Sequence, residues 1–349
     1  MKKFFLSLAV LVMALCANAQ TNQYFWYNGN LMMGNPIAQI DSVTFGEGEP
    51  ADTLHILLPR TIIKEVHDTV YITIHDTVCP NDIPEGALNG LFSVSADKKV
   101  RFSKGNLQYQ ASTDTWRFAE NQYDYVGDAS LGTVYEGEEK CNNALISNTY
   151  TGWIDYFEWG TGDNPSSVYD NRNDFVDWGQ NIISNGGNLP NLWHTLTKME
   201  WHYLFYSRNN ASILFGFGSI GGINGLIILP DDWSTPQGIV FTPSTEKGLE
   251  NQGVEYYNST GDNFSHNTYT FQQWKIMEKN GAIFFPAAGG RGAGYTIISI
   301  GEGAAYWSSS PKEEGVSFLL DINNYRLAPL DDLYPLGDGR SVRLVQDVK

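Results

Sequence analysis

The chain has 349 residues, with 39 acidic and 22 basic side chains and a formal net charge of −17 at pH 7. An acidic chain without a Lys/Arg cluster repels phosphate backbones, which argues against nucleic acid as a partner. The 35 glycines and the 10 Trp, 19 Tyr and 18 Phe residues exclude a disordered chain or a helical bundle. They indicate short strands joined by long loops.

The first residues have the order of a signal peptide. Two lysines precede an apolar run over residues 4–15, which leads into the small-residue motif Ala17-Asn18-Ala19. This order predicts a signal peptide over residues 1–19, with cleavage near Ala19-Gln20. We therefore expect a protein that is secreted or held at the outer cell surface.

Two alternatives remain for this segment. One is a buried N-terminal helix. The other is lipidation at Cys16, although Leu15 stands where a lipoprotein signal has a small residue. The apolar run is too short to span a bilayer, and no later run is long enough, so we expect no transmembrane segment in the mature chain.

Residues 20–47 form a small unit. An aromatic run over residues 24–27 precedes Asn28-Gly29, and a second apolar run extends from Ile37 to Phe45. Asn-Gly between two such runs predicts a β-hairpin. A lone hairpin is marginally stable in water, so an assembly role in an adhesin or structural subunit is one alternative for the chain.

Residues 48–86 are predicted to be an extended spacer between Pro/Gly-rich boundaries. The segment His67-Asp68-Thr69-Val70 recurs as His75-Asp76-Thr77-Val78, and its alternation has the period of a strand. The two histidines are either a metal pair or solvated linker residues. Export would permit a disulfide between Cys79 and Cys141, but no Cys/His spacing predicts zinc.

Residues 87–346 are predicted to be the main domain. Alternating residues over Gly90–Tyr109 and Arg340–Val345 predict strands, and the apolar runs Leu226–Leu229 and Ile283–Pro286 predict buried strands. A helix is predicted over Trp193–Tyr206, with Thr197 and Glu200 in the spacing of a capping box. A second helix is predicted over Thr270–Asn280, ended by Gly281.

Six short motifs occur in order along this domain: residues 102–109 (FSKGNLQY), 193–201 (WHTLTKMEW), 229–233 (LPDDW), 285–289 (FPAAG), 306–310 (YWSSS) and 339–345 (GRSVRLV). Together they resemble the major paralogous domain (FISUMP type) of secreted bacterial proteins. That group is similar to the formylglycine-generating-enzyme subgroup of the C-type lectin-like fold. The resemblance implies an α+β domain with short sheets, one or two helices and long loops. It also implies that a strand near Val94–Phe102 pairs with the closing strand Gly339–Val345.

The residues give little support to catalysis. A formylglycine-generating enzyme needs paired thiols in its C-terminal part, and no cysteine follows Cys141. The histidines of the domain, His194, His202 and His266, lie near no nucleophile turn such as G-x-S-x-G. We therefore predict no catalytic residues. A degenerate oxidase or a hydrolase acting on an extracellular polymer is the alternative.

No cofactor or metal is predicted. The paired acids Asp231-Asp232 and Asp331-Asp332 could supply oxygens to calcium, but the ligand triplets of calcium-dependent lectins are missing. The glycine-rich run over residues 289–294 lacks the Lys-Ser/Thr ending of a phosphate-binding loop. Solvated loop carboxylates and a turn are the simpler interpretations.

Binding is the better hypothesis for function. In variable receptor-binding relatives of the resembled fold, the residues between the Trp-Ser-Ser motif and the last strand face the ligand. The corresponding span, Ser310–Asp338, contains the predicted ligand-binding residues Asn323, Asn324, Tyr325, Arg326, Asp331, Asp332 and Tyr334. Tyrosine and asparagine suit an adaptable binding surface for an extracellular protein or glycan. The alternative is that these side chains pack the loops. Trp307 is expected in the core, and structural roles are expected for Arg340 and Arg343.

Overall fold

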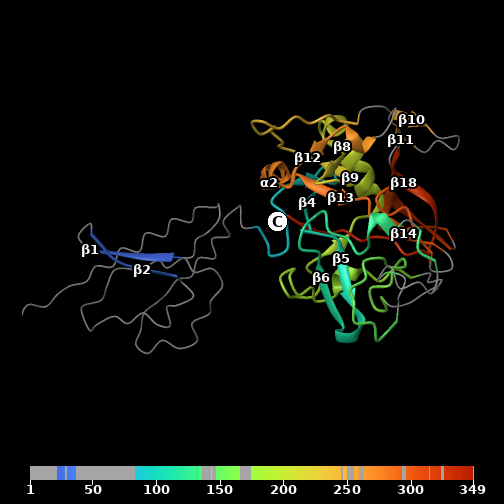
Figure 1. Ribbon diagram of the computed structural model, residues 1–349, viewed down its shortest axis with the longest axis horizontal. Coiled ribbons are helices and arrows are strands. Elements are labelled where there is room, and N and C mark those ends of the chain that lie inside the picture. The colour runs from blue at the N-terminus through green and yellow to red at the C-terminus, as the bar shows by residue number, and fades with distance from the viewer. Residues whose placement is uncertain are drawn as a thin grey trace, which may run out of the picture. The chain divides into compact units, whose positions relative to one another are not determined.

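The computed structural model divides the chain into two compact units, Met1–Asp82 and Ile83–Lys349 (Figure 1). In the first unit the structure describes the backbone of residues 22–27 and 30–36. In the second it describes residues 83–348 apart from 132, 136–142, 144–146, 166–173, 245–246, 250–254, 259–262, 293–295, 314 and 324–325. The predicted signal peptide, the spacer histidines and both Cys79 and Cys141 lie outside the described residues.

The first unit contains a hairpin of β1 (Asn22–Tyr27) and β2 (Asn30–Pro36). Tyr27 pairs directly with Asn30, so two residues connect β1 to β2. The prediction of a hairpin at Asn28-Gly29 is confirmed, with its return strand at Asn30–Pro36. The apolar run Ile37–Phe45, from which the return strand was expected, lies outside the described residues. The two-residue connection brings the next residues into pairing at once.

The second unit is an α+β domain. Its larger sheets are β10-β11-β18-β17-β16, β12-β8-β9-β13 and β3-β4-β19-β7, and smaller ones are β5-β6 and β14-β15. The strands are β3 (Phe92–Ser93), β4 (Lys99–Phe102), β5 (Leu107–Gln110), β6 (Thr115–Phe118), β7 (His194–Thr195), β8 (Phe215–Ile220), β9 (Ile223–Ile228), β10 (Lys247–Leu249), β11 (Glu255–Asn258), β12 (Thr268–Tyr269), β13 (Ile283–Pro286), β14 (Gly290–Arg291), β15 (Ile297–Ile298), β16 (Gly303–Glu313), β17 (Val316–Asn323), β18 (Arg326–Pro335) and β19 (Leu344–Asp347). Short strands with long connections match the expectation from the glycine and aromatic content.

The two ends of the domain pair with each other. Strand β19 runs antiparallel to β4, with Val345 opposite Phe102 and Asp347 opposite Val100. The predicted pairing of an early strand with the closing strand is confirmed. On its other side β19 pairs with β7, where Leu344 lies opposite Thr195.

The first helix is shorter than predicted. Helix α1 (Lys198–His202) begins after Thr197, whose hydroxyl accepts from the Glu200 N–H while the Glu200 carboxylate accepts from the Thr197 N–H. The capping box is confirmed, but the preceding residues 193–197 are not helical because His194 and Thr195 form β7. A π-helix (Tyr203–Ser207) continues α1.

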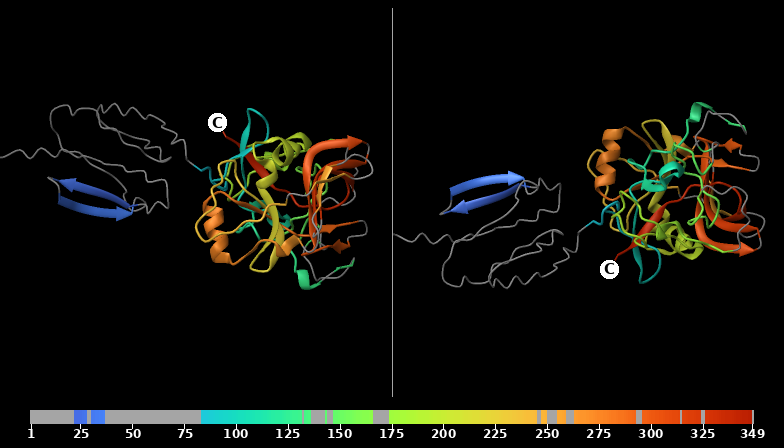
Figure 2. Two further views of the ribbon diagram at one scale, coloured as in Figure 1. Left: turned by 90° about the horizontal axis from the view of Figure 1, so that it is seen from above. Right: turned by 90° about the horizontal axis from the view of Figure 1, so that it is seen from below.

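The second helix matches its prediction. Helix α2 (Phe271–Lys279) has Thr270 at its N-cap in a capping box with Gln273. Gly281 follows with a φ of 90°, which favours glycine. Short 3₁₀ helices lie at Ala111–Thr113, Ala129–Leu131, Trp178–Gln180, Ala211–Ile213 and Asn263–Ser265. Helix α2 and the strands β16–β18 lie on opposite sides of this unit (Figure 2).

Aromatic side chains make up much of the core. Phe102 of β4 packs edge to face on Phe285 of β13, with ring centroids 5.7 Å apart, and Trp201 of α1 packs on both rings. Trp307 of β16 is buried, as expected, and donates its indole N–H to the Phe157 carbonyl. Within the described part of the chain, no helix is both long and apolar enough to cross a lipid bilayer.

Candidate functional site

Three of the predicted binding residues converge on one carboxylate. Arg326 Nη2 donates to Asp321 Oδ2 at 2.8 Å, and Asn323 Nδ2 lies 3.4 Å from the same oxygen. The Tyr334 hydroxyl lies 3.3 Å from Asp321 Oδ1. We call these four residues the Asp321 cluster. They come from β17 and β18, which pair antiparallel with Ser317 opposite Tyr334.

The Asp321 cluster lies at the boundary between core and solvent. The side chains of Asp321 and Arg326 are 9% and 20% exposed, and Asn323 and Tyr334 are half-buried. A carboxylate that has left water needs several donors, and here a guanidinium, an amide and a phenol supply them. The cluster therefore holds its side chains in place before any ligand arrives, while part of each remains accessible.

A second, more buried ion pair, Arg340 with Asp338, contacts the Asp321 cluster through Tyr334. The Arg340 guanidinium lies 4.7 Å from the centre of the Tyr334 ring and donates to Asp338 Oδ2 at 2.6 Å. Burial raises the pKa of the Asp338 carboxyl, while the charges of Arg340 and Arg291 oppose that rise. Arg340 is 5% exposed, so the expectation of a structural role for it is supported by its burial and its partner.

Two Gly-Arg segments next to this ion pair are joined by backbone hydrogen bonds. Gly290-Arg291 of β14 runs beside Gly339-Arg340, and Arg291 and Gly339 exchange backbone hydrogen bonds of 2.8 and 2.9 Å. Each arginine lies against the other segment's glycine: a Cβ at Gly290 would overlap Arg340 Nη1, and one at Gly339 would lie 2.8 Å from Arg291 Cζ. Within the glycine-rich run, position 290 therefore requires glycine, because the buried Arg340 guanidinium packs closely against it.

Buried acids complete the ionic groups of this region. Arg291 Nη2 lies 3.6 Å from Glu158 Oε1, and both side chains are at most 2% exposed. Farther in, Arg343 is fully buried and donates to the amide oxygens of Asn106 and Gln122, at 3.2 and 3.1 Å. Burial lowers the pKa of Arg343 to about 10. Arg343 thus has the structural role that was expected of it.

Another buried carboxyl lies apart from these pairs. Asp155 accepts from the Val126 N–H at 2.7 Å and from Asn143 Nδ2 at 2.6 Å. Burial raises its pKa to about 7, and the two hydrogen bonds oppose that rise. Because all of its described contacts are internal, Asp155 anchors loops and makes no part of an exposed site.

The other predicted binding residues are described less fully. Asn324 and Tyr325 lie outside the described residues. Asp331 and Asp332 belong to β18, where Asp331 is opposite Leu319, and the structure does not describe their side chains. Asp321 itself was missed by the sequence prediction, although it lies two residues before Asn323 and therefore on the same face of a strand.

The alternatives of a hydrolase or a metal site find no supporting arrangement among the described residues. His194 lies 3.3 Å from Lys98 Nζ and 3.5 Å from Asp347 Oδ1, and the His202 ring packs on Tyr206. Among the described side chains, no group of three or more His, Cys, Asp or Glu residues is placed to hold a metal ion.

The Asp231 carboxylate, a possible calcium ligand, is engaged by protein groups. It accepts from the Ser93 N–H and hydroxyl and pairs with Lys99 and Arg208 at 3.2 and 3.4 Å. These partners lower the pKa of Asp231 against the opposing effect of burial. Asp231 therefore links β3 to the loop after β9.

No protein-family model, no curated protein and no solved structure matches this chain.

Proposed function

We propose that this chain is an exported binding protein, secreted or held at the cell surface, with a non-catalytic C-type lectin-like domain of the formylglycine-generating-enzyme subgroup. Its ligand is an extracellular protein or glycan. Export rests on the signal-peptide order of residues 1–19. The fold assignment rests on the resemblance of the six motifs, and the pairing of β4 with β19 is what that fold requires.

The Asp321 cluster is the observation that supports binding. Side chains that bind by hydrogen bonding gain affinity when they are held in place beforehand, because less conformational entropy is lost on association. Asn323, Arg326 and Tyr334 are held in this way and keep exposed area. They combine a cation, an amide and a phenol, which is the chemistry of a polar recognition surface.

The proposal can be tested on arrays of glycans and bacterial surface proteins. The purified chain should bind at least one class of ligand, and Arg326→Gln and Asn323→Ala should weaken that binding. A matched control is Lys275→Gln, on the exposed side of α2, which should bind as the unaltered chain does. Cleavage of a polymer without stable binding, or binding that both cluster variants leave intact, would overturn the proposal.

A further inference from the structure

The Arg117 guanidinium lies over an indole ring. Arg117 is on β6, directly opposite Gln108 of β5, and its Nε donates to Gln108 Oε1 at 2.9 Å. Its guanidinium carbon is 3.7 Å from the centre of the Trp153 ring. Arg117 and Trp153 are both half-buried, whereas Gln108 is buried. One hydrogen bond and one cation–π contact therefore restrict the orientation of the guanidinium.

Arg117 differs from the other arginines that the structure describes. Four of them form ion pairs with a carboxylate: Arg208 with Asp231, Arg291 with Glu158, Arg326 with Asp321 and Arg340 with Asp338. Two more are buried and donate to carbonyl or amide oxygens: Arg101 to Leu88 and Asn89, and Arg343 to Asn106 and Gln122. Within the described part of the chain, Arg117 is the half-exposed arginine without an ion-pair partner.

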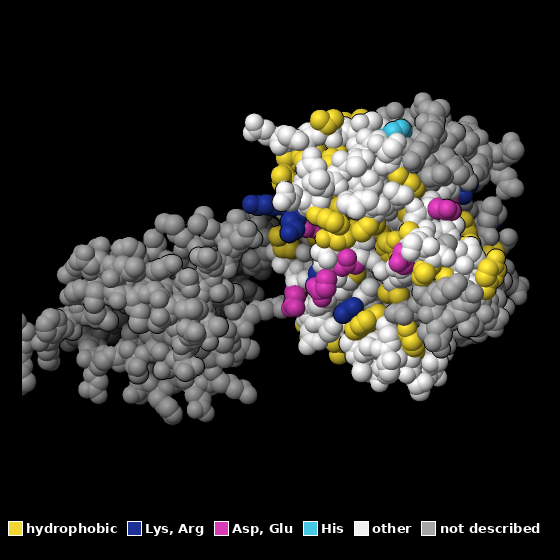
Figure 3. All heavy atoms as spheres, in the orientation of Figure 1, with side chains coloured by type: hydrophobic (Ala, Val, Ile, Leu, Met, Phe, Trp, Pro, Cys, Tyr) yellow, Lys and Arg dark blue, Asp and Glu magenta, His cyan; other side chains and the backbone are white. Residues whose placement is uncertain are grey.

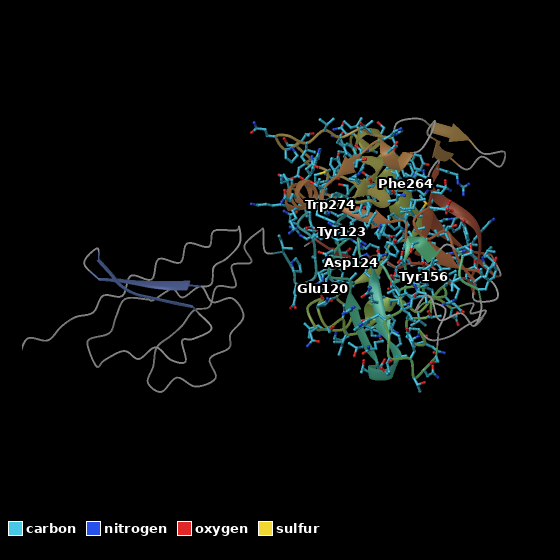
Figure 4. The ribbon with its side chains drawn as sticks, in the orientation of Figure 1. Glu120, Tyr123, Asp124, Tyr156, Phe264 and Trp274 are labelled. Atoms are coloured by element: carbon cyan, nitrogen blue, oxygen red, sulfur yellow. The ribbon has the colours of Figure 1, made fainter. Side chains whose placement is uncertain are left out.

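The nearest acids are engaged elsewhere. Glu120 pairs with Lys104 at 3.1 Å, and Asp124 accepts from the backbone and side-chain N–H groups of Asn121, both at 2.9 Å. Glu120 and Asp124, which are labelled in Figure 4, follow β6 in the chain and are not part of the β5–β6 hairpin. Burial lowers the pKa of Arg117, and these two acids only oppose that effect from a distance. The cost of desolvating the guanidinium thus has no adjacent anion to offset it.

We propose that Arg117 and Trp153 form a binding site for the carboxylate of an acidic sugar, a uronate. The terminal amino groups of Arg117, which donate no hydrogen bond to a described residue, present a planar fork that matches a carboxylate. Trp153 adds apolar area beside it. Gln110 and Thr115 are the next pair along the same face of the hairpin. The Gln110 amide donates to the Thr151 carbonyl and the Thr115 hydroxyl to the Thr113 carbonyl, so both side chains are fixed beside the proposed site.

Charge favours an isolated carboxylate over a polyanion. The chain carries a net charge of −17, which repels ligands with many charges. On the face drawn in Figure 3, only a few Lys and Arg side chains are visible, and several acidic side chains lie close to one another. One fixed arginine suits one carboxylate on an otherwise neutral, hydroxylated ligand. This site is separate from the Asp321 cluster, so either proposal can fail while the other holds.

The test compares a charged sugar with its neutral counterpart. The purified full chain is titrated by calorimetry with a glucuronate-containing disaccharide and with the matching glucose disaccharide. The uronate should bind at least tenfold more tightly, because only it can form the charged, bidentate contact. Arg117→Gln should remove this preference, and Arg117→Lys, which keeps the charge without the fork, should lower uronate affinity about tenfold.

Controls distinguish variants that have lost the ligand contact from variants that have unfolded. Thermal midpoints of both Arg117 variants should lie close to that of the unaltered chain. Lys275→Gln, on the exposed side of α2, should leave uronate binding unchanged. Equal binding of the two sugars, or a preference that persists in Arg117→Gln, would overturn the proposal. Tighter binding of a neutral-capped glutamyl peptide than of the uronate at Arg117 would also overturn the proposal.

Discussion

Removing the Asp321 carboxylate should destabilise the β17–β18 pair by a predictable amount. Asp321→Ala deletes the charged hydrogen bond from Arg326 at 2.8 Å and the longer contact with the Tyr334 hydroxyl at 3.3 Å. A hydrogen bond to a charged group contributes about 1.5–3 kcal/mol, and a long neutral one contributes at the low end of about 0.5–1.5 kcal/mol. Arg326 is 20% exposed, so water partly replaces what it loses. We therefore expect the free energy of unfolding to fall by about 2–3 kcal/mol.

Chemical and thermal denaturation measure this loss. For a domain of this size, about 2–3 kcal/mol corresponds to a fall of the thermal midpoint by roughly 5–10 °C. A double-mutant cycle with Arg326→Ala should give a coupling energy of about 1–2 kcal/mol. The matched control is Glu120→Ala, which breaks the more exposed pair with Lys104 and should cost under about 1 kcal/mol. A coupling energy near zero for Asp321 and Arg326 would refute the reasoning.

Three further changes test other parts of the domain. Because burial raises the Asp155 pKa to about 7, above its unfolded value of 3.8, the native state holds a proton that the unfolded state has lost. Stability should therefore fall as pH rises from about 4 to 7, and denaturation midpoints of Asp155→Asn at several pH values should lack that slope. Gly290→Ala overlaps a buried guanidinium and should cost over about 2 kcal/mol, whereas Gly292→Ala, with nothing within 4 Å, should change stability by under about 0.5 kcal/mol in the same urea titration. Thr270→Ala removes the α2 cap and should lower stability by about 1 kcal/mol, and an unchanged midpoint would contradict the capping argument.

Elements with local signals could be predicted from the sequence. Helix α2 matches its prediction because Thr270, Gln273 and Gly281 mark both of its ends within eleven residues. Strand β13 matches because four consecutive apolar residues end at a proline. The predicted helix over residues 193–206 fails at its start because His194 and Thr195 pair with β19, a partner about 150 residues away. No local pattern contains that pairing.

In the candidate site too, contacts between residues close in sequence could be predicted, whereas contacts between distant segments could not. Arg326 and Asp321 could have been joined on sequence grounds, because they flank the connection between two adjacent strands. Glu158 could not, because it reaches Arg291 only through the folding of a long irregular segment. The glycine-rich run over residues 289–294 is interpreted from the sequence as a turn, and Gly339 as the start of the closing strand. The packing role of these glycines depends on two segments about 50 residues apart lying side by side.

Buried arginines explain how a domain with so much irregular backbone satisfies its hydrogen bonds. Arg208 donates to the carbonyls of Leu214 and Leu229, and Arg101 donates to those of Leu88 and Asn89. Each guanidinium has five donors, so one side chain can serve several loop carbonyls that no strand or helix reaches. Buried acids such as Glu158 and Asp338 pair with other buried arginines, and the chain as a whole keeps a net charge of −17. In a chain with this excess of acids, a half-exposed arginine that no described acid neutralises is the position where we expect a single carboxylate to bind without competing with the protein's own acids.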